Sequence, residues 1–238
     1  MMNKITLISL VSALSCGSLA YAGGMGGDLT NSGFIAVEGG YSTNSIKNYD
    51  FGFIGAGGVT EIASTKSNQN YAGRLAAGML FMMDEQFGVT SELGWGYYGR
   101  TTLKPANTLI ANVNSKYTIT GFDALIGIAF IQPSYSLSFK AGALIQNIQS
   151  ETEAVFSDVD TFSFQVKRIQ TAALPEIKLG ASYNIDNNWS ITGAYVFVAG
   201  SSPRMDGVVN ANTLNATFFS NTQNTTLNLG LLGIQYTC

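Results

Sequence analysis

Seven ionisable side chains are the residues that offer chemistry, and each falls in the polar phase of a segment in which apolar and polar residues alternate. They are Glu38, Arg74, Glu92, Asp123, Lys140, Glu176 and Lys178. Successive side chains of a β-strand point to opposite faces, so these charges share the polar faces of their strands. Inside a narrow barrel they would either form ion pairs that close the interior or line a gated ion path. We favour closure, because an unpaired buried charge is costly.

Composition gives little support to catalysis. The chain has no histidine, which excludes every mechanism that needs an imidazole as base, acid or metal ligand. Four acids between residues 151 and 160 offer oxygen ligands to Ca²⁺, but their spacing is not that of an EF-hand, and a solvated acidic loop explains them better. No run of Lys and Arg suggests nucleic-acid binding. We therefore predict a protein that is not an enzyme, with no catalytic residue, no cofactor and no metal site.

The alternation that positions the charges runs through eight segments. The clearest spans residues 135–145, with one apolar face made by Tyr135, Leu137, Phe139, Ala141, Ala143 and Ile145. Charged residues are 11% of the chain, against about 25% in ordinary soluble domains. The mature chain has no apolar stretch long enough for a membrane helix, and a closed barrel is the other structure that satisfies its backbone in lipid. The sequence thus predicts an all-β fold, an eight-stranded antiparallel transmembrane barrel.

Turn residues divide the expected strands into hairpins. The strands are expected near residues 33–42, 70–83, 86–98, 116–131, 135–145, 169–184, 189–199 and 224–238. Connections at Asp84, Pro133 and Asp186 are short, whereas residues 43–69, 99–115, 150–168 and 200–223 are expected to be long loops. Short periplasmic turns and longer extracellular loops are typical of outer-membrane barrels. Tyr117 and Ile119 fall out of the apolar phase, which predicts a bulge or a phase change near residues 120–121.

A soluble carrier barrel would show the same alternation with its apolar face turned inward. Aromatic residues near the strand ends, the low charge fraction and the small residues on the polar faces favour the membrane instead. The N-terminus has the pattern of a secretory signal, with Lys4, a short apolar stretch and a small-x-small site at residues 20–22. We expect a signal peptide over residues 1–22, Sec export with cleavage after Ala22, a flexible segment over 23–32 and a barrel over 33–238. Lipoprotein processing at Cys16 is the alternative.

The C-terminal residues carry a resemblance to a known family. Gly233, Tyr236 and the terminal Cys238 resemble the assembly signal of bacterial outer-membrane barrels, in which the last residue is usually Phe or Trp. With the eight segments, the chain resembles the small eight-stranded barrels of the OmpA transmembrane type, without the periplasmic peptidoglycan-binding domain. The resemblance implies a monomer in the bacterial outer membrane, in contact with lipid and lipopolysaccharide, that the barrel-assembly machinery inserts. Enzymatic barrels of similar architecture depend on histidine, which this chain lacks.

Aromatic residues in the expected loops are candidates for contact with a partner. They are Phe51, Phe53, Phe156, Phe162, Phe164, Phe218 and Phe219. They suit equally well the packing of loops against one another, or strands that extend above the bilayer. The expected function is therefore structural or surface-interacting: envelope integrity, adhesion or recognition. The alternative is a narrow channel, or a binder or transporter of small hydrophobic molecules.

Overall fold

The computed structural model describes residues 31–44, 50–55, 58–105, 111–156, 162–200, 205–211, 214–220 and 226–238. The strands of these residues are β1 (Ser32–Asn44), β2 (Asp50–Gly55), β3 (Gly58–Gln69), β4 (Tyr71–Met82), β5 (Phe87–Pro105), β6 (Ala111–Ile131), β7 (Tyr135–Phe156), β8 (Phe162–Asn184), β9 (Trp189–Val198), β10 (Met205–Ala211), β11 (Leu214–Ser220) and β12 (Leu227–Thr237). Within those ranges no helix has the length and hydrophobicity that a membrane crossing requires. The predicted signal peptide lies outside the described residues.

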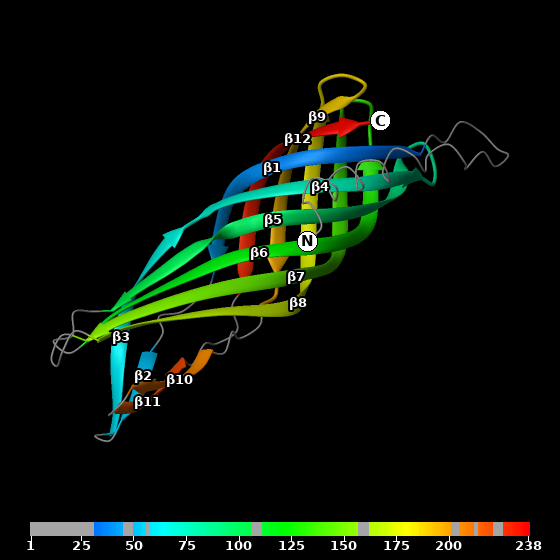
Figure 1. The fold of residues 1–238 in the computed structure, drawn as a ribbon. Coiled ribbons are helices and arrows are strands. Elements are labelled where there is room, and N and C mark those ends of the chain that lie inside the picture. The colour runs from blue at the N-terminus through cyan, green and yellow to red at the C-terminus, as the bar shows by residue number, and fades with distance from the viewer. Residues whose placement is uncertain are drawn as a thin grey trace, which may run out of the picture.

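Eight of these strands close into a ring. Going round it, the order is β1, β4, β5, β6, β7, β8, β9 and β12, and β12 pairs back onto β1 (Figure 1). All pairs are antiparallel. The closing ladder runs from Asn44↔Leu227 to Phe34↔Thr237, and Gly33 and Cys238 then exchange two backbone hydrogen bonds of 3.0 and 2.9 Å. The predicted eight-stranded antiparallel barrel, closed by its first and last strands, is confirmed.

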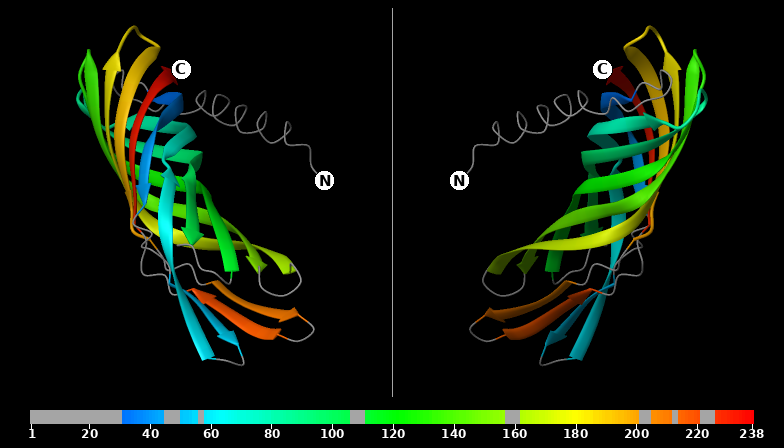
Figure 2. Two further views of the ribbon diagram at one scale, coloured as in Figure 1. Left: turned by 90° about the vertical axis from the view of Figure 1, so that its left-hand side faces the viewer. Right: turned by 90° about the vertical axis from the view of Figure 1, so that its right-hand side faces the viewer.

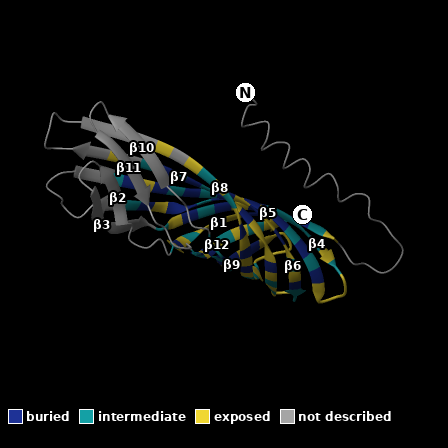
Figure 3. Cartoon of the chain, turned by 90° about the horizontal axis from the view of Figure 1, so that it is seen from below, coloured by how far each residue is buried: buried dark blue, intermediate teal, exposed yellow. Residues whose placement is uncertain are grey.

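The outer wall of the ring is apolar and exposed. Phe139 is 45% exposed, whereas the next residue, Lys140, is 7% exposed and points into the lumen. The same alternation leaves exposed apolar side chains on every strand of the ring, as Figure 3 shows by the alternation of yellow and dark blue. A soluble protein rarely exposes so continuous an apolar surface, and in an outer-membrane barrel this belt faces lipid. A soluble carrier would have the belt inside.

Aspartates build two of the short turns. Asp84 Oδ1 accepts hydrogen bonds from the backbone N–H groups of Gln86 and Phe87 at 2.8 and 2.7 Å. Asp186 Oδ1 accepts from Asn188 and Trp189 in the same way, at 2.8 and 2.7 Å. An aspartate that caps its own turn allows the chain to reverse within a few residues. The short connections at these positions are thus confirmed.

The four long segments lie where they are predicted, but much of each forms strand and not irregular loop. Residues 43–69 contain β2 and β3, residues 200–223 contain β10 and β11, and β5 to β8 continue far beyond their expected ends. β10, β11, β2 and β3 pair in that order, and β3 pairs with residues 100–105 at the end of β5 that lies far from the short turns. These four strands form the layer at the bottom of Figure 2. These segments are mixed in composition and irregular in period, so hydrophobic alternation does not reveal them. They become strands because each finds a ladder partner for its backbone.

The predicted irregularity in β6 lies on the neighbouring strand instead. β6 keeps one phase throughout, and Tyr117 and Ile119 are buried in the lumen. The register shifts on β5, where Tyr97 pairs with Thr120 but Arg100 pairs with Thr118. Gly99 within this bulge has a φ of 105°, a left-handed conformation that favours glycine. Tyr117 and Ile119 are apolar residues in the polar phase of β6 because they fill the interior, not because the strand changes face.

Candidate functional site

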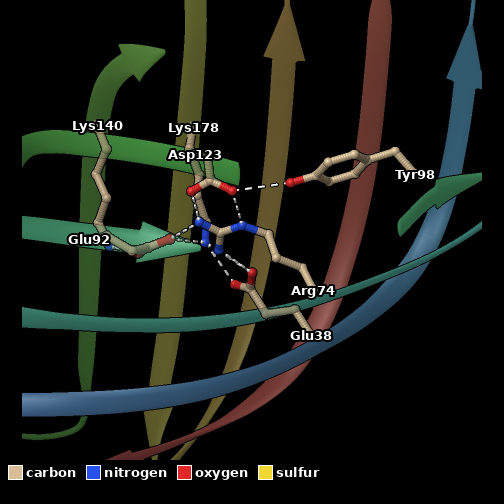
Figure 4. A network of polar contacts seen from close by, with 7 residues as sticks. All are labelled: Glu38, Arg74, Glu92, Tyr98, Asp123, Lys140 and Lys178. Atoms are coloured by element: carbon tan, nitrogen blue, oxygen red, sulfur yellow. Dashed lines mark hydrogen bonds and ion pairs between the residues drawn. The ribbon is translucent and has the colours of Figure 1, made fainter. Parts of the chain in front are cut away.

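The ladder registers bring the seven predicted charges to the middle of the lumen. Glu38 of β1 lies opposite Arg74 of β4, Lys140 of β7 lies opposite Lys178 of β8, and Asp123 of β6 lies opposite Gly94 of β5. All seven side chains are buried. Six of them meet in one cluster, which we call the lumen ion network: Glu38, Arg74, Glu92, Asp123, Lys140 and Lys178 (Figure 4).

Arg74 is the centre of the lumen ion network. Its Nη1 lies 2.7 Å from Glu38 Oε2, and its Nη2 lies 2.6 Å from Glu92 Oε1. Its Nε donates to Asp123 Oδ2 at 2.9 Å, and Nη2 also contacts Asp123 Oδ1, so that pair is bidentate. The planar guanidinium suits this arrangement, because its donors point at several carboxylates at once.

The two lysines complete the network from the opposite wall. Lys178 Nζ lies 2.8 Å from both Glu38 Oε1 and Glu92 Oε1, and Lys140 Nζ contacts Glu92 Oε2. Glu92 therefore binds all three cations. Three cations face three carboxylates, so the network is balanced in charge. Such a balance is what allows charges to be buried, since each removed partner would leave an uncompensated ion.

Glu176 is the predicted charge that the structure does not join to the others. It is buried on β8, two residues before Lys178, yet it forms no ion pair with a described residue. Its Oε2 has no hydrogen-bond partner in the described part of the chain. The prediction of a shared lumen position holds for Glu176, but the prediction that all seven charges pair does not.

Tyr98 is a member of the site that sequence reasoning missed. It is buried at the bulge of β5, and its hydroxyl donates to Asp123 Oδ2 at 3.1 Å (Figure 4). Its phase could have indicated this position, because Tyr98 lies an even number of residues after Glu92 and therefore points to the same face of the strand. The residue lies at the expected end of its strand, where phase is hard to assign.

Above the network the lumen is filled by apolar side chains, a layer that the polar phase of the strands does not predict. The buried cluster consists of Ala72, Tyr98, Ile119, Leu144, Leu174, Val196, Val198, Leu227, Leu229 and Leu231. On β7, the order from the turn upward is Lys140 and then Leu144, so the apolar cluster lies on the side of the long extensions. The interior is thus closed by two successive layers, one ionic and one apolar.

Inward glycines make the room that these side chains need. A Cβ on Gly94 would lie 2.4 Å from Arg74 Nη2 and 2.6 Å from Asp123 Oδ2. A Cβ on Gly96 would lie 2.8 Å from the ring of Tyr98. The small residues on the polar faces therefore do not leave the interior empty. They accommodate large side chains from neighbouring strands at close packing.

The phenylalanines that the sequence assigns to loops lie in strands. Phe51 and Phe53 are on β2, Phe218 and Phe219 are on β11, and these two strands pair, with Phe218 opposite Phe53. The other three lie in the upper ends of β7 and β8, where Phe156 pairs with Phe162 and Phe164 follows on β8. The backbone thus separates the seven into two groups. Their role as interaction residues stays a prediction.

The last C-terminal residues occupy the rim of the barrel at the short-turn end, where the Tyr236 ring meets Trp189 edge-on with centroids 5.0 Å apart. Gly233 lies further from the rim on β12, opposite Glu38. Cys238 is exposed, and its thiol lies 3.6 Å from the carbonyl oxygen of Gly33. The predicted outward phase of Cys238 is confirmed. Of the four loop acids, Asp158 and Asp160 lie outside the described residues, and no metal-binding group of three acidic or thiol side chains occurs in the rest.

Comparison with known proteins finds similarity among solved structures. No family model matches the chain, and no curated protein matches it. It is similar to OprG, an outer membrane protein of Pseudomonas aeruginosa, at 13% identity over 87% of this chain and 96% of that one, with a TM-score of 0.45. It is also similar to Ail, the attachment invasion locus protein of Yersinia pestis, at 13% identity over 87% and 99%, with a TM-score of 0.36.

A third similar structure is the outer membrane protease OmpT of Escherichia coli, at 10% identity over 91% of this chain and 99% of that one, with a TM-score of 0.47. Because all three TM-scores are below 0.5, the fold is assigned from the geometry of this chain itself. That geometry consists of a closed ring of eight antiparallel strands, an apolar belt outside it and a lumen packed with an ionic and an apolar layer. By this architecture the chain has the fold of a small eight-stranded outer-membrane β-barrel.

Proposed function

We propose that this barrel acts through its wall and its extracellular strands, in envelope integrity or in recognition at the cell surface. The observation that carries the proposal is the closed lumen. Arg74 alone contacts three carboxylates, and the apolar cluster lies directly above the network. An eight-stranded barrel is just wide enough to be filled by side chains, so little space is left for a file of water.

The surface that remains for function is the extension above the ring. β10, β11, β2 and β3, together with the long upper parts of β5 to β8, hold much of the chain outside the ring itself. Loops and strand extensions at the outer face are where barrels of this type contact other surfaces. The seven phenylalanines of these segments remain our candidates for such a contact. Catalysis is not proposed, because the chain has no histidine.

The remaining steps of the proposal concern biogenesis. The chain is exported through the Sec pathway and cleaved after Ala22, and the barrel-assembly machinery inserts it through Gly233, Tyr236 and Cys238. It then stands as a monomer among lipopolysaccharide. The outward position of Tyr236 and Cys238 on the last strand supports this role, because both are available at the rim.

Removal of the extracellular extension distinguishes a role in envelope integrity from a role in recognition. Residues 45–69 and 200–225 are replaced by short turns, and cells lacking the protein are complemented with the trimmed or the full chain. A role in envelope integrity predicts that both restore resistance to detergent. A role in recognition predicts that only the full chain restores adhesion to a surface. If neither chain changes either property in a strain where deletion has an effect, the proposed function is wrong.

A further inference from the structure

The upper part of β8 is an open edge of the sheet. β7 pairs with β8 over residues 162–183 of β8, whereas β9 pairs with it only over residues 176–184. Just above that ladder, Ala199 N donates a hydrogen bond of 3.0 Å to the carbonyl oxygen of Pro175. Beyond Pro175, none of the described strands pairs with β8 on the β9 side. From residue 174 up to residue 162, β8 therefore has a described strand partner on one side only.

Alternate residues in this part of β8 direct their backbone groups to the open side. In an antiparallel ladder the N–H and C=O of one residue point to one neighbouring strand, and those of the next residue point to the other. The carbonyl of Pro175 points to Ala199, so the backbone groups of odd-numbered residues face the β9 side. A proline at such a position removes no hydrogen bond to β7. The residues above it whose N–H and C=O face the open side are Ser163, Gln165, Lys167, Ile169, Thr171 and Ala173.

The open edge begins where β8 leaves the bilayer. The part of β8 that β9 covers, residues 176–184, is close to the ~9–11 residues with which a strand crosses a membrane. An open edge is not tolerated inside lipid, whereas above the bilayer it is tolerated but remains a template for another strand. Lys167 marks the free part as lying outside lipid, because its exposed side chain forms an ion pair of 3.4 Å with Glu151 of β7.

β10 is the other open edge of the same extension. It pairs with β11 on one side and with no described strand on the other. Figure 2 shows the layer to which β10 belongs as separate from the upper end of β8. The ladders that lead from β10 through β11, β2, β3, β5, β6 and β7 to β8 are all antiparallel, and their number is odd. β10 therefore runs antiparallel to β8, as β9 does.

The register of β9 on β8, continued upward, would set the whole of β10 on the free edge. Val198 lies opposite Glu176, and each further residue along β9 lies opposite the preceding residue of β8. Without a bulge, this register places residues 205–211 of β10 opposite residues 169–163 of β8. The upper end of β10 would then lie level with the upper end of β8, which begins at Phe162. Direction, length and register of β10 thus all fit the edge that β9 leaves open.

We propose that β10 docks on the free edge of β8 and closes the extension into a second ring above the first. The strands of that ring would be β5, β6, β7, β8, β10, β11, β2 and β3, which are eight in number like those of the ring below. Barrel diameter grows with strand number, so an equal number continues the lower ring, whereas an added strand from another protein would widen it. The register would also set Asp206 opposite Arg168, and opposite charges across a strand pair are stabilising.

The closure would act as a switch on what the extension offers to a partner. The open arrangement of the structure leaves the edges of β8 and β10 available for pairing with an extended segment of another protein. The closed ring withdraws both edges, because each satisfies the backbone of the other. This consequence rests on the proposed role in surface recognition, whereas the closure itself does not.

Paired cysteines test the register of the closure in the full chain, folded in detergent micelles with both of its own cysteines replaced by serine. Val166→Cys with Val208→Cys changes two positions that would lie opposite each other with Cα atoms about 4.5 Å apart, within reach of a disulfide. On oxidation this pair should form at least roughly tenfold more disulfide within one molecule than Val166→Cys with Val209→Cys, whose thiols would point to opposite faces. Val208→Cys with Thr217→Cys, two positions that pair in the structure, is the positive control.

Amide hydrogen exchange, resolved by residue, tests whether the closed ring is populated without a cross-link. In the proposed register Val209→Pro removes an N–H that is donated to β8 and none that is donated to β11, so the open form should still fold. Exchange at Gln165, Lys167 and Ile169 should be at least roughly tenfold slower in the parent than in Val209→Pro. The even-numbered residues of β8 bond to β7 in both forms and serve as the internal control.

Three results would overturn the proposal. The first is that Val166→Cys with Val208→Cys forms no more disulfide within one molecule than the shifted pair, and the second is that its disulfide joins two molecules. The third is that Gln165, Lys167 and Ile169 exchange equally fast in the parent and in Val209→Pro. Neither readout involves adhesion, so failure of the closure and failure of the proposed function are seen in separate experiments.

Discussion

Replacing Gly94 by alanine tests the packing of the lumen beside the ion network. The added Cβ would lie 2.4 Å from Arg74 Nη2, 2.6 Å from Asp123 Oδ2 and 2.7 Å from Arg74 Cζ. Real Cβ atoms do not approach other heavy atoms so closely. The guanidinium must therefore move away from Asp123, or β5 must move away from β4 and β6. Either change disturbs the bidentate pair at the centre of the network.

The magnitude follows from two costs and one gain. Overpacking a well-filled interior costs about 1–3 kcal/mol, and weakening a charge-assisted hydrogen bond costs about 1.5–3 kcal/mol. The two overlap, because the displaced guanidinium is what relieves the crowding. Alanine in place of glycine within a strand returns roughly 0.5–1 kcal/mol. We therefore expect Gly94→Ala to lower the free energy of unfolding by about 2 kcal/mol.

Gly230→Ala is the matched control. Gly230 lies on the outer face of β12, and a Cβ added there has no heavy atom within 4 Å. This variant gains the same backbone term without a clash, so it should be neutral or up to about 1 kcal/mol more stable than the parent. Reversible urea unfolding in lipid vesicles, followed by tryptophan fluorescence, measures both. Equal stability of Gly94→Ala and Gly230→Ala would refute the packed lumen derived above.

Further predictions concern the wall, the network and the closing strand. Phe139→Arg should destabilise the inserted barrel by about 2–4 kcal/mol if position 139 lies near the midplane, and urea titration in vesicles measures it; no change would remove Phe139 from lipid. Glu92→Gln should cost about 3–5 kcal/mol, because Glu92 holds three cations, whereas Glu176→Gln should stay within about 1 kcal/mol of the parent; the reverse order would contradict the network. Cys238→Phe should preserve or improve folding by on the order of 1 kcal/mol, as heat-modifiable migration reports, and loss of folding would contradict the outward position at the rim.

Period-two alternation was sufficient to predict the ring and most of its charges. In a barrel one face of each strand meets lipid and the other meets the lumen. The apolar residues of a strand therefore show which of its faces points to lipid. Lys140 between Phe139 and Ala141 is an example, and the structure places its side chain inside. Phase also places Glu38 and Arg74 on the same face, and the register of β1 with β4 then sets them opposite each other.

The features that sequence reasoning missed are those in which phase and polarity disagree. Tyr117 and Ile119 are apolar residues on a polar face, because they fill the upper lumen and not because they meet lipid. β2 and β11 are short strands of mixed composition without regular alternation, so no local pattern reveals them. Each forms a hairpin with its chain neighbour, and the two then pair with each other across a long separation in sequence. Glu176 has the same phase as its charged neighbours, and only the geometry shows that its Oε2 has no hydrogen-bond partner among the described residues.

The closed lumen is the central claim, and conductance in planar bilayers tests it most directly. Purified barrel inserted at high salt should show no large, stable unitary current, because the lumen ion network and the apolar cluster fill the interior. Because no current is expected, substitutions that neutralise Arg74 or Lys140 have no ion selectivity to change. Steady unitary currents from the parent, with a selectivity that shifts when either residue is neutralised, would contradict the account.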